Sequence, residues 1–204
     1  MHKKDNPQLI LASSSAYRRE LLSRLQLPFI TLVPNVDETP LASEKPTETA
    51  LRLARLKAEA VASQLGDSSE ALIIGSDQVA TLDNLQIGKP GNHENALKQL
   101  QLMRGREVIF HTALCLLDTR KSAPDPLQVQ DISTIVRFRE LNDAELDAYL
   151  KIEKPYDCAG SAKNEALGIT ILSSIQSNDP TALTGLPLIA LTSMLRNAGI
   201  NFFS

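Results

Sequence analysis

Short apolar runs alternate along this chain with longer amphipathic stretches, and this alternation restricts the fold more than any other feature. Residues 71–75 form the clearest buried strand, and residues 9–12 and 29–33 form two more. Between them apolar side chains recur at helical spacing, most clearly from Thr47, the expected cap, to about residue 65. Strands that alternate with helices predict an α/β protein, because the helices then cover the faces of a sheet.

The second half of the chain continues this pattern. Residues 79–87 read as a hairpin that turns at Asp83 and Asn84, and Asn142 is a candidate helix cap. The other expected elements are two long strands, three helices and one short strand, at 108–117, 129–138, 93–103, 142–150, 186–197 and 168–172. The 204 residues, 43% of them hydrophobic, suffice for one domain over 1–204, or two small lobes around one cleft.

Composition also narrows the function. The net charge of −3 argues against a broadly basic nucleic-acid binder. Apolar runs of a few residues are far below the roughly 20 needed to cross a membrane, and the N-terminal apolar patch is too short for a signal peptide, so we expect a cytoplasmic protein with no membrane partner. Cys115 and Cys158 stand alone, which predicts reduced thiols rather than a disulfide or a zinc site.

A run of serines leads into a helix whose first turn is basic. Residues 13–19 read Ser-Ser-Ser-Ala-Tyr-Arg-Arg and follow the first strand. Cations oppose the dipole at a helix N-terminus, whereas backbone N–H groups, serine hydroxyls and arginine together favour a bound phosphate. Ser13 and Arg18 are therefore candidates for phosphate binding. The alternative is that Ser15 is an ordinary N-cap and both arginines point into water.

Two charged residues interrupt apolar segments. Lys57 lies within the apolar stripe of its helix, which consists of Ala50, Leu53, Ala54, Ala60 and Val61. A lysine there either extends to the helix edge or meets a buried anion. Asp77 stands at the carboxyl end of the 72–74 strand, the edge where ligands gather in open α/β sheets. Its carboxylate could bind a divalent cation or take a proton from water, or it could cap a turn.

Other charges complete a recognisable set. Glu38 lies on a proline-bounded loop, and Lys89 stands between Gly88 and Pro90. The small-residue loop at 157–165 permits close approach of a ligand and contains Glu165; the alternative is an ordinary surface loop. Cations suit a triphosphate, and carboxylates suit Mg²⁺ and a water. Together they predict metal-assisted attack on a phosphorus.

Seven motifs, in order, carry a family resemblance: LASSSAYRRELL, VDET, LARLKA, GSDQV, GKP, CAGSAKNE and GLPL. The chain resembles the Maf (septum-formation) family of nucleoside triphosphate pyrophosphatases over nearly its whole length. The resemblance implies hydrolysis between the α and β phosphates of a nucleoside triphosphate, with a divalent metal, Mg²⁺ or Mn²⁺. It also implies a two-lobed mixed sheet with flanking helices and a central cleft, as in inosine triphosphate pyrophosphatases, and a possible homodimer.

The resemblance also assigns roles by position. Asp77 is the expected catalytic proton acceptor, and Glu38 is expected to hold the metal with it. The implied phosphate-binding residues are Ser13, Arg18, Lys57 and Lys89.

Three positions separate the subgroups of the family, namely Tyr17, Gln78 and Glu165. An aromatic residue, Gln and Glu resemble the 7-methyl-GTP pyrophosphatase subgroup, although that subgroup usually has Trp where Tyr17 stands. Methylation at N7 makes guanine a cation, which an aromatic face attracts by about 0.5–2 kcal/mol. A carboxylate can accept from the guanine N1–H and amino group, and a pyrimidine would leave it unpaired.

Two alternatives from the sequence remain. One keeps the reaction but changes the base, giving a pyrophosphatase for pyrimidine or other non-standard nucleotides. The other is a nucleotide-binding regulator of cell division without turnover. The triplet of subgroup positions argues against the first, and the water-activating carboxylate argues against the second.

Overall fold

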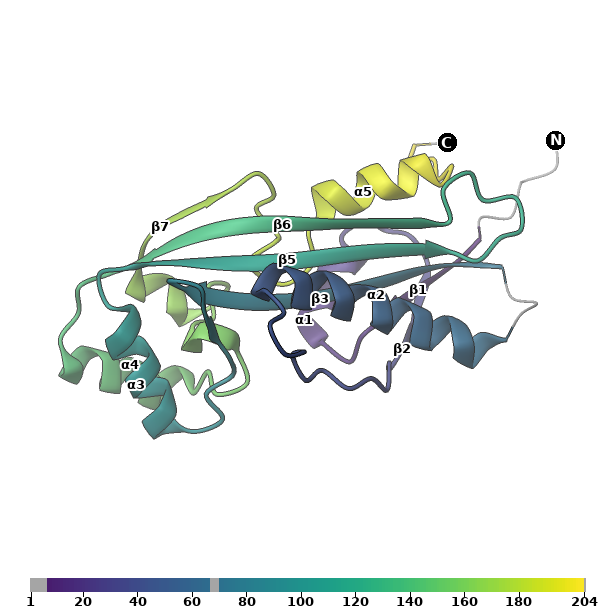
Figure 1. Ribbon diagram of the computed structural model, residues 1–204. Helices are drawn as coiled ribbons and strands as arrows, with labels where there is room; N and C mark the ends of the chain where they lie inside the picture. Colours follow the sequence, from purple (N-terminus) through teal and green to yellow (C-terminus); the bar gives the residue numbers. More distant parts are fainter. Residues whose placement is uncertain (1–6, 67–69, 204) are drawn as a thin grey trace.

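Seven strands form one mixed sheet that extends through the length of the molecule (Figure 1). The computed structural model describes residues 7–66 and 70–203. The strands are β1 (Gln8–Ala12), β2 (Phe29–Leu32), β3 (Ala71–Leu82), β4 (Leu85–Ile87), β5 (Glu107–Asp118), β6 (Leu127–Phe138) and β7 (Leu172–Ser177). The helices are α1 (Ala16–Ser23), α2 (Pro46–Leu65), α3 (His93–Met103), α4 (Asp143–Glu153) and α5 (Leu188–Asn197), with 3₁₀ helices η1 (Ala159–Ser161) and η2 (Leu167–Ile171). The predicted α/β class is confirmed.

The strand order is β2-β1-β3-β5-β6-β7. The short strand β4 pairs with the end of β3 on the same side as β1, beyond the point where β1 stops. β1 runs parallel to β2 and β3, and the other pairs are antiparallel. β3, β5 and β6 have 12 residues each, which corresponds to about 40 Å of extended chain. These three strands are therefore long enough to carry helices at both ends of the sheet.

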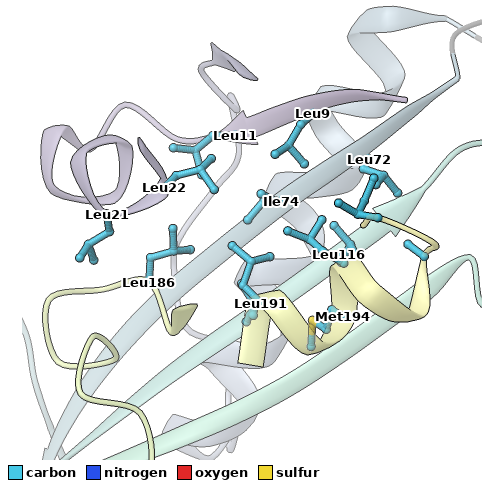
Figure 2. Packing of buried hydrophobic residues seen from close by; sticks show 14 of the residues in the cluster. Leu9, Leu11, Leu21, Leu22, Leu72, Ile74, Leu116, Leu186, Leu191 and Met194 are labelled. Atoms are coloured by element: carbon cyan, nitrogen blue, oxygen red, sulfur yellow. The ribbon is translucent and has the colours of Figure 1, made fainter. Parts of the chain in front are cut away.

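Two layers of helices cover one end of the sheet. Alternate residues of β3 point to opposite faces, so Leu72 and Ile74 pack toward α1 and α5 while Ile73 and Val79 pack toward α2. Figure 2 shows the first of these clusters, in which leucines of β1, β3, β5, α1 and α5 meet. A separate cluster joins α3 and α4 to the far ends of β3, β5 and β6 (Figure 1).

Close contact between α2 and β3 depends on Gly75. A Cβ at this position would lie 2.0 Å from the carbonyl oxygen of Ala54, so only glycine lets the helix backbone approach the strand this closely. The buried face of α2 contains Ala58 where Ala60 was expected, and Lys57 lies beside it. Lys57 therefore faces the sheet.

Three sequence expectations are wrong in detail. The strand expected at 168–172 is instead η2, because Gly168 packs against the backbone of Lys163; the strand β7 begins only at Leu172. Thr47 does not cap α2, which begins at Pro46; Glu48 closes the helix start by accepting from the Lys45 amide. β3 does not end near Ile74 but continues to Leu82, so Asp77 lies within a strand.

Other local expectations are confirmed. Asp83 and Asn84 form the turn between β3 and β4 with positive φ angles of 49° and 67°. Asn142 caps α4 by accepting from the Glu145 amide. Both cysteines are free. Within 7–66 and 70–203, every helix is too short or too polar to cross a membrane.

Candidate functional site

A single cleft of about 830 Å³ brings together all nine residues that the sequence singled out. They are Ser13, Tyr17, Arg18, Glu38, Lys57, Asp77, Gln78, Lys89 and Glu165. They span positions 13 to 165 of the sequence and include residues of α1, α2 and β3. The fold thus brings these residues together in one cleft, while their roles in binding and catalysis stay a prediction.

The cleft opens where β3 lacks a strand neighbour on one side. β1 pairs with β3 as far as Gly75, and β4 pairs with it only from Ala80. The four residues between them, 76–79, have β5 on the other side but no strand on this side within the part of the chain described. We call this the edge gap. Because β1 ends at Ala12 opposite Gly75, the loop that starts at Ser13 leaves the sheet directly beside it.

The side chains of neighbouring residues in the edge gap point to opposite faces of the sheet. Asp77 points toward α2, where Lys57 donates to its Oδ1 at 2.6 Å. Lys57 Nζ also lies 2.7 Å from Glu38 Oε1. Lys57 and Asp77 are only 6% and 8% exposed, so this ion pair is largely shielded from water. Of the two outcomes that the sequence left open for Lys57, the structure shows the buried ion pair.

Burial and charge act in opposite directions on the two carboxylates. Burial raises the pKa of Asp77, and the positive charges of Lys57 and Arg18 partly offset that rise. The hydrogen bond from Lys57 lowers the pKa of Glu38, which is more exposed. Asp77 is therefore the better proton acceptor of the two, because its proton affinity is the higher.

The loop that presents Glu38 is held by a second ion pair. Arg52 on α2 donates to both carboxylate oxygens of Glu44, at 2.6 and 2.8 Å, and to the Thr39 carbonyl at 3.1 Å. Glu44 also accepts from the Leu41 amide at 3.0 Å. These contacts tie the segment that follows Glu38 to α2, the helix that carries Lys57.

Ser13 and Arg18 lie at the junction of β1 and α1. Ser15 caps the helix by accepting from the Arg18 amide, and Ser13 Oγ accepts from the Ser15 amide at 3.1 Å. Arg18 does not simply point into water, because its Nε donates to the Gly185 carbonyl at 2.8 Å. Burial lowers the pKa of Arg18, opposed by Asp77 and Glu38. The guanidinium thus lies within electrostatic range of both carboxylates.

Lys89 is exposed on the segment between β4 and α3. Its charge contributes to lowering the pKa of Glu38, after the larger contributions of Lys57. Lys89 therefore adds a second cation near the same carboxylate, and the cleft holds positive charge from three separate parts of the chain.

The other end of the cleft contains Tyr17, Gln78 and Glu165. Burial raises the pKa of Tyr17, and the negative charge of Glu165 adds to that rise against the opposing effect of Lys163. Burial also raises the pKa of Glu165. Tyr17 on α1 and Glu165 on the loop after η1 therefore line the same cleft within electrostatic range of one another.

One loop organises this end of the cleft, and sequence reasoning did not identify it. The carbonyls of Ala182, Leu183 and Gly185 point toward the edge gap and accept hydrogen bonds from the side chains of four residues. The donors are Ser76, Gln78 and Thr112 together with Arg18. We call residues 182–185 the carbonyl loop.

The carbonyl loop is anchored by buried Asp179. Its Oδ2 accepts from the Ile189 amide at 2.7 Å and the Ala190 amide at 3.2 Å, which caps the start of α5. Its Oδ1 accepts from the amide and hydroxyl of Thr181. The Asp179–Pro180 turn before an apolar helix was the available sequence signal for this anchor.

The fold and the cleft together define a class: α/β proteins in which cations and carboxylates from several elements converge on a gap in the sheet. The family model described as "Maf-like protein" matches residues 8–198. This chain therefore belongs to the Maf family.

Curated relatives match almost the full chain. A Cupriavidus metallidurans protein named 7-methyl-GTP pyrophosphatase is 63% identical over 203 residues, covering 100% of this chain and 99% of the relative. A Burkholderia thailandensis protein with the same name is 64% identical, covering 97% and 90%.

Two solved structures are similar at lower levels. A nucleoside-triphosphatase (dITP/XTP pyrophosphatase) from Mycobacterium abscessus has a TM-score of 0.45 and 14% identity, with 94% of each chain covered. The Staphylococcus aureus Ham1 protein has a TM-score of 0.44 and 19% identity, with 65% of this chain and 72% of that one covered.

Proposed function

We propose that this protein hydrolyses 7-methyl-GTP to 7-methyl-GMP and pyrophosphate. The observation that carries the proposal is the convergence of Lys57, Asp77 and Glu38 in one cleft with Arg18 and Lys89. The names of relatives that are 63% and 64% identical support this choice of nucleotide. A triphosphate needs several cations, and its hydrolysis needs a base for the attacking water.

Asp77 is the proposed base. Its carboxylate takes a proton from water as the water oxygen attacks phosphorus, and the bond to the pyrophosphate oxygen breaks. Burial raises the pKa of Asp77, which strengthens it as an acceptor, while the charge and hydrogen bond of Lys57 oppose that rise and favour the carboxylate form. Lys57, Arg18 and Lys89 bind the phosphate oxygens and offset their charge.

The carboxylates of Asp77 and Glu38 fit a divalent cation such as Mg²⁺ or Mn²⁺. Both lie within hydrogen-bond distance of the same Lys57 nitrogen, at 2.6 and 2.7 Å, so they face a common point. Residues 7–66 and 70–203 contain no cluster of three or more His, Cys, Asp or Glu suited to a metal. Magnesium typically uses one or two carboxylates and completes its shell with phosphates and water. When bound, such an ion neutralises phosphate charge and acidifies water.

The base end of the cleft suits a methylated guanine. Tyr17 offers an aromatic face to the cationic ring, and Glu165 offers acceptors to its N1–H and amino group. GTP lacks the positive ring, and a pyrimidine presents a different set of donors. The cleft is therefore expected to prefer 7-methyl-GTP over both.

A panel of triphosphates tests the proposal. Pyrophosphate release is measured for 7-methyl-GTP, GTP, UTP and CTP, each with Mg²⁺, with Mn²⁺ and with chelator. We expect the highest kcat/KM for 7-methyl-GTP and a requirement for metal. Higher turnover of a pyrimidine nucleotide would identify the alternative substrate class, and binding without product would identify a regulator.

The proposed base is tested by Asp77→Asn. Loss of a general base typically lowers the rate by 10²–10⁴-fold, and kcat should fall by about that factor while circular dichroism stays unchanged. Asp83→Asn is the matched control, because Asp83 lies on the same hairpin but outside the cleft. Near-wild-type turnover by Asp77→Asn would exclude Asp77 as the proton acceptor.

A further inference from the structure

The amide of Gln78 has an unusual set of neighbours. Its Nε2 lies 2.9 Å from Thr112 Oγ1, 3.1 Å from the Ala182 carbonyl and 3.0 Å from the Leu183 carbonyl. Within residues 7–66 and 70–203, no donor is hydrogen-bonded to the amide oxygen Oε1. The side chain lines the cleft and is only half-buried.

Counting protons fixes which way this amide faces. Carbonyl oxygens can only accept, so two of the three neighbours require the NH₂ group. The third neighbour, Thr112, is fully buried and has one hydroxyl proton, which it donates to the Ala182 carbonyl at 3.0 Å. Thr112 therefore meets Gln78 as an acceptor, and the two NH₂ protons of Gln78 are shared among three acceptors. The reversed amide would place an oxygen against two carbonyl oxygens with no proton between them.

We propose that Thr112 is a positioning residue that, with the carbonyl loop, holds Gln78 as a hydrogen-bond acceptor toward the nucleotide base. Thr112 performs two tasks with one hydroxyl. It accepts from Gln78 and it ties the Ala182 carbonyl to β5. Its position is well defined, because β5 lies between β3 and β6 in the sheet and Thr112 pairs with Gln78 in register.

The orientation has a consequence for the ligand. With its NH₂ group occupied, Gln78 offers the base only its oxygen, and Glu165 also offers only acceptors. This end of the cleft is therefore matched to a base edge rich in donors, such as N1–H and the amino group of guanine. This proposal about Thr112 and Gln78 rests on the proposed function, because it concerns the same nucleotide.

Two substitutions at position 112 distinguish the effect of the hydroxyl group from the effect of side-chain volume. Thr112→Val keeps the volume and removes the hydroxyl, whereas Thr112→Ser keeps the hydroxyl. Thr134→Val is the matched control, since Thr134 is fully buried in the adjacent strand and its Oγ1 has no partner within the described residues. Steady-state kinetics are measured with 7-methyl-GTP and CTP for all four proteins.

In Thr112→Val we expect the preference for 7-methyl-GTP over CTP, as a ratio of kcat/KM, to fall about three- to tenfold. The loss should lie in KM for 7-methyl-GTP, with kcat within about twofold of wild type, because base contacts bind without reacting. Thr112→Ser and Thr134→Val should keep the ratio. An unchanged ratio in folded Thr112→Val, or an equal loss in Thr112→Ser, would overturn the proposal.

A second measurement needs no substrate. The side-chain amide protons of Gln78 are assigned by ¹⁵N NMR through their loss in Gln78→Met, and their exchange with water is followed. Exchange should be slow in wild type and Thr112→Ser and about tenfold or more faster in Thr112→Val. Fast exchange in wild type would overturn the proposal. If wild type shows no preference for 7-methyl-GTP, the proposed function fails and this measurement still decides the role of Thr112.

Discussion

The two ends of the cleft are built from neighbouring residues of one strand by different means. At the charged end, Asp77 is held by Lys57, which also reaches Glu38. At the amide end, Gln78 is held by Thr112 and by backbone carbonyls. The contacts at the charged end therefore depend on which side chains are ionised, whereas the contacts at the amide end depend on where the backbone carbonyls lie. One strand supports both because successive side chains point to opposite faces.

The largest effect should come from removing the cation of the charged end. Lys57→Met leaves buried Asp77 without its partner, and breaking such a pair typically costs about 3–5 kcal/mol. We expect a loss of that order in the free energy of unfolding at pH 7, measured with urea, and loss of turnover. Corresponding disruption of the amide end should leave stability much closer to wild type.

The pH dependence of this loss has a definite sign. Burial already raises the pKa of Asp77, and removing Lys57 raises it further. A carboxyl with a raised pKa in the folded state contributes stability below its ordinary pKa, near 3.8, and loses it as the pH rises through the folded value. The deficit of Lys57→Met should thus shrink in acid. A deficit independent of pH, or one that Asp77→Leu fails to relieve in the double variant, would contradict this account.

A smaller effect should follow at the base end. Glu165→Gln keeps the shape and removes a charge, so the preference for 7-methyl-GTP over UTP should fall about tenfold, as expected for one charge-assisted hydrogen bond. Burial raises the pKa of Glu165, so the wild-type preference should also decline as the pH falls and the carboxylate takes a proton. The kcat/KM ratio from pH 5 to 8 tests both statements. A ratio that is the same in Glu165→Gln and wild type would remove Glu165 from base recognition.

The smallest effect concerns the support of the charged end. Glu44→Gln weakens the contact with Arg52 that holds the Glu38 segment, and kcat should fall a few fold. The hydrogen bond from Arg52 lowers the pKa of Glu44 to about 2. Its stabilisation is therefore complete above pH 4.5 and is lost as the pH falls toward 2. Thermal melts from pH 2 to 6 should show wild type and variant converging in acid; parallel curves would contradict it.

The sequence predicted the members of the site better than their surroundings. Lys57 was detectable because a charge in an apolar stripe either extends to the helix edge or meets a buried anion, and Asp77 because it follows a buried run. The extension of β3 to Leu82 could not be predicted, because pairing with β4 and β5 sustains it. The roles of Thr112 and the carbonyl loop were not predicted from the sequence. Their contacts use backbone carbonyls, which every residue has, so no particular side chain marks them.

The edge gap also bears on whether strands of other molecules can pair with this sheet. Unpaired strand edges ordinarily attract strands from other molecules. Here the free stretch is four residues, 76–79, shorter than a typical strand and bounded at each end by β1 and β4. A foreign strand has no room to enter, whereas a small molecule does. The same interruption that leaves room for a nucleotide-sized molecule is thus too short to favour strand pairing through this edge.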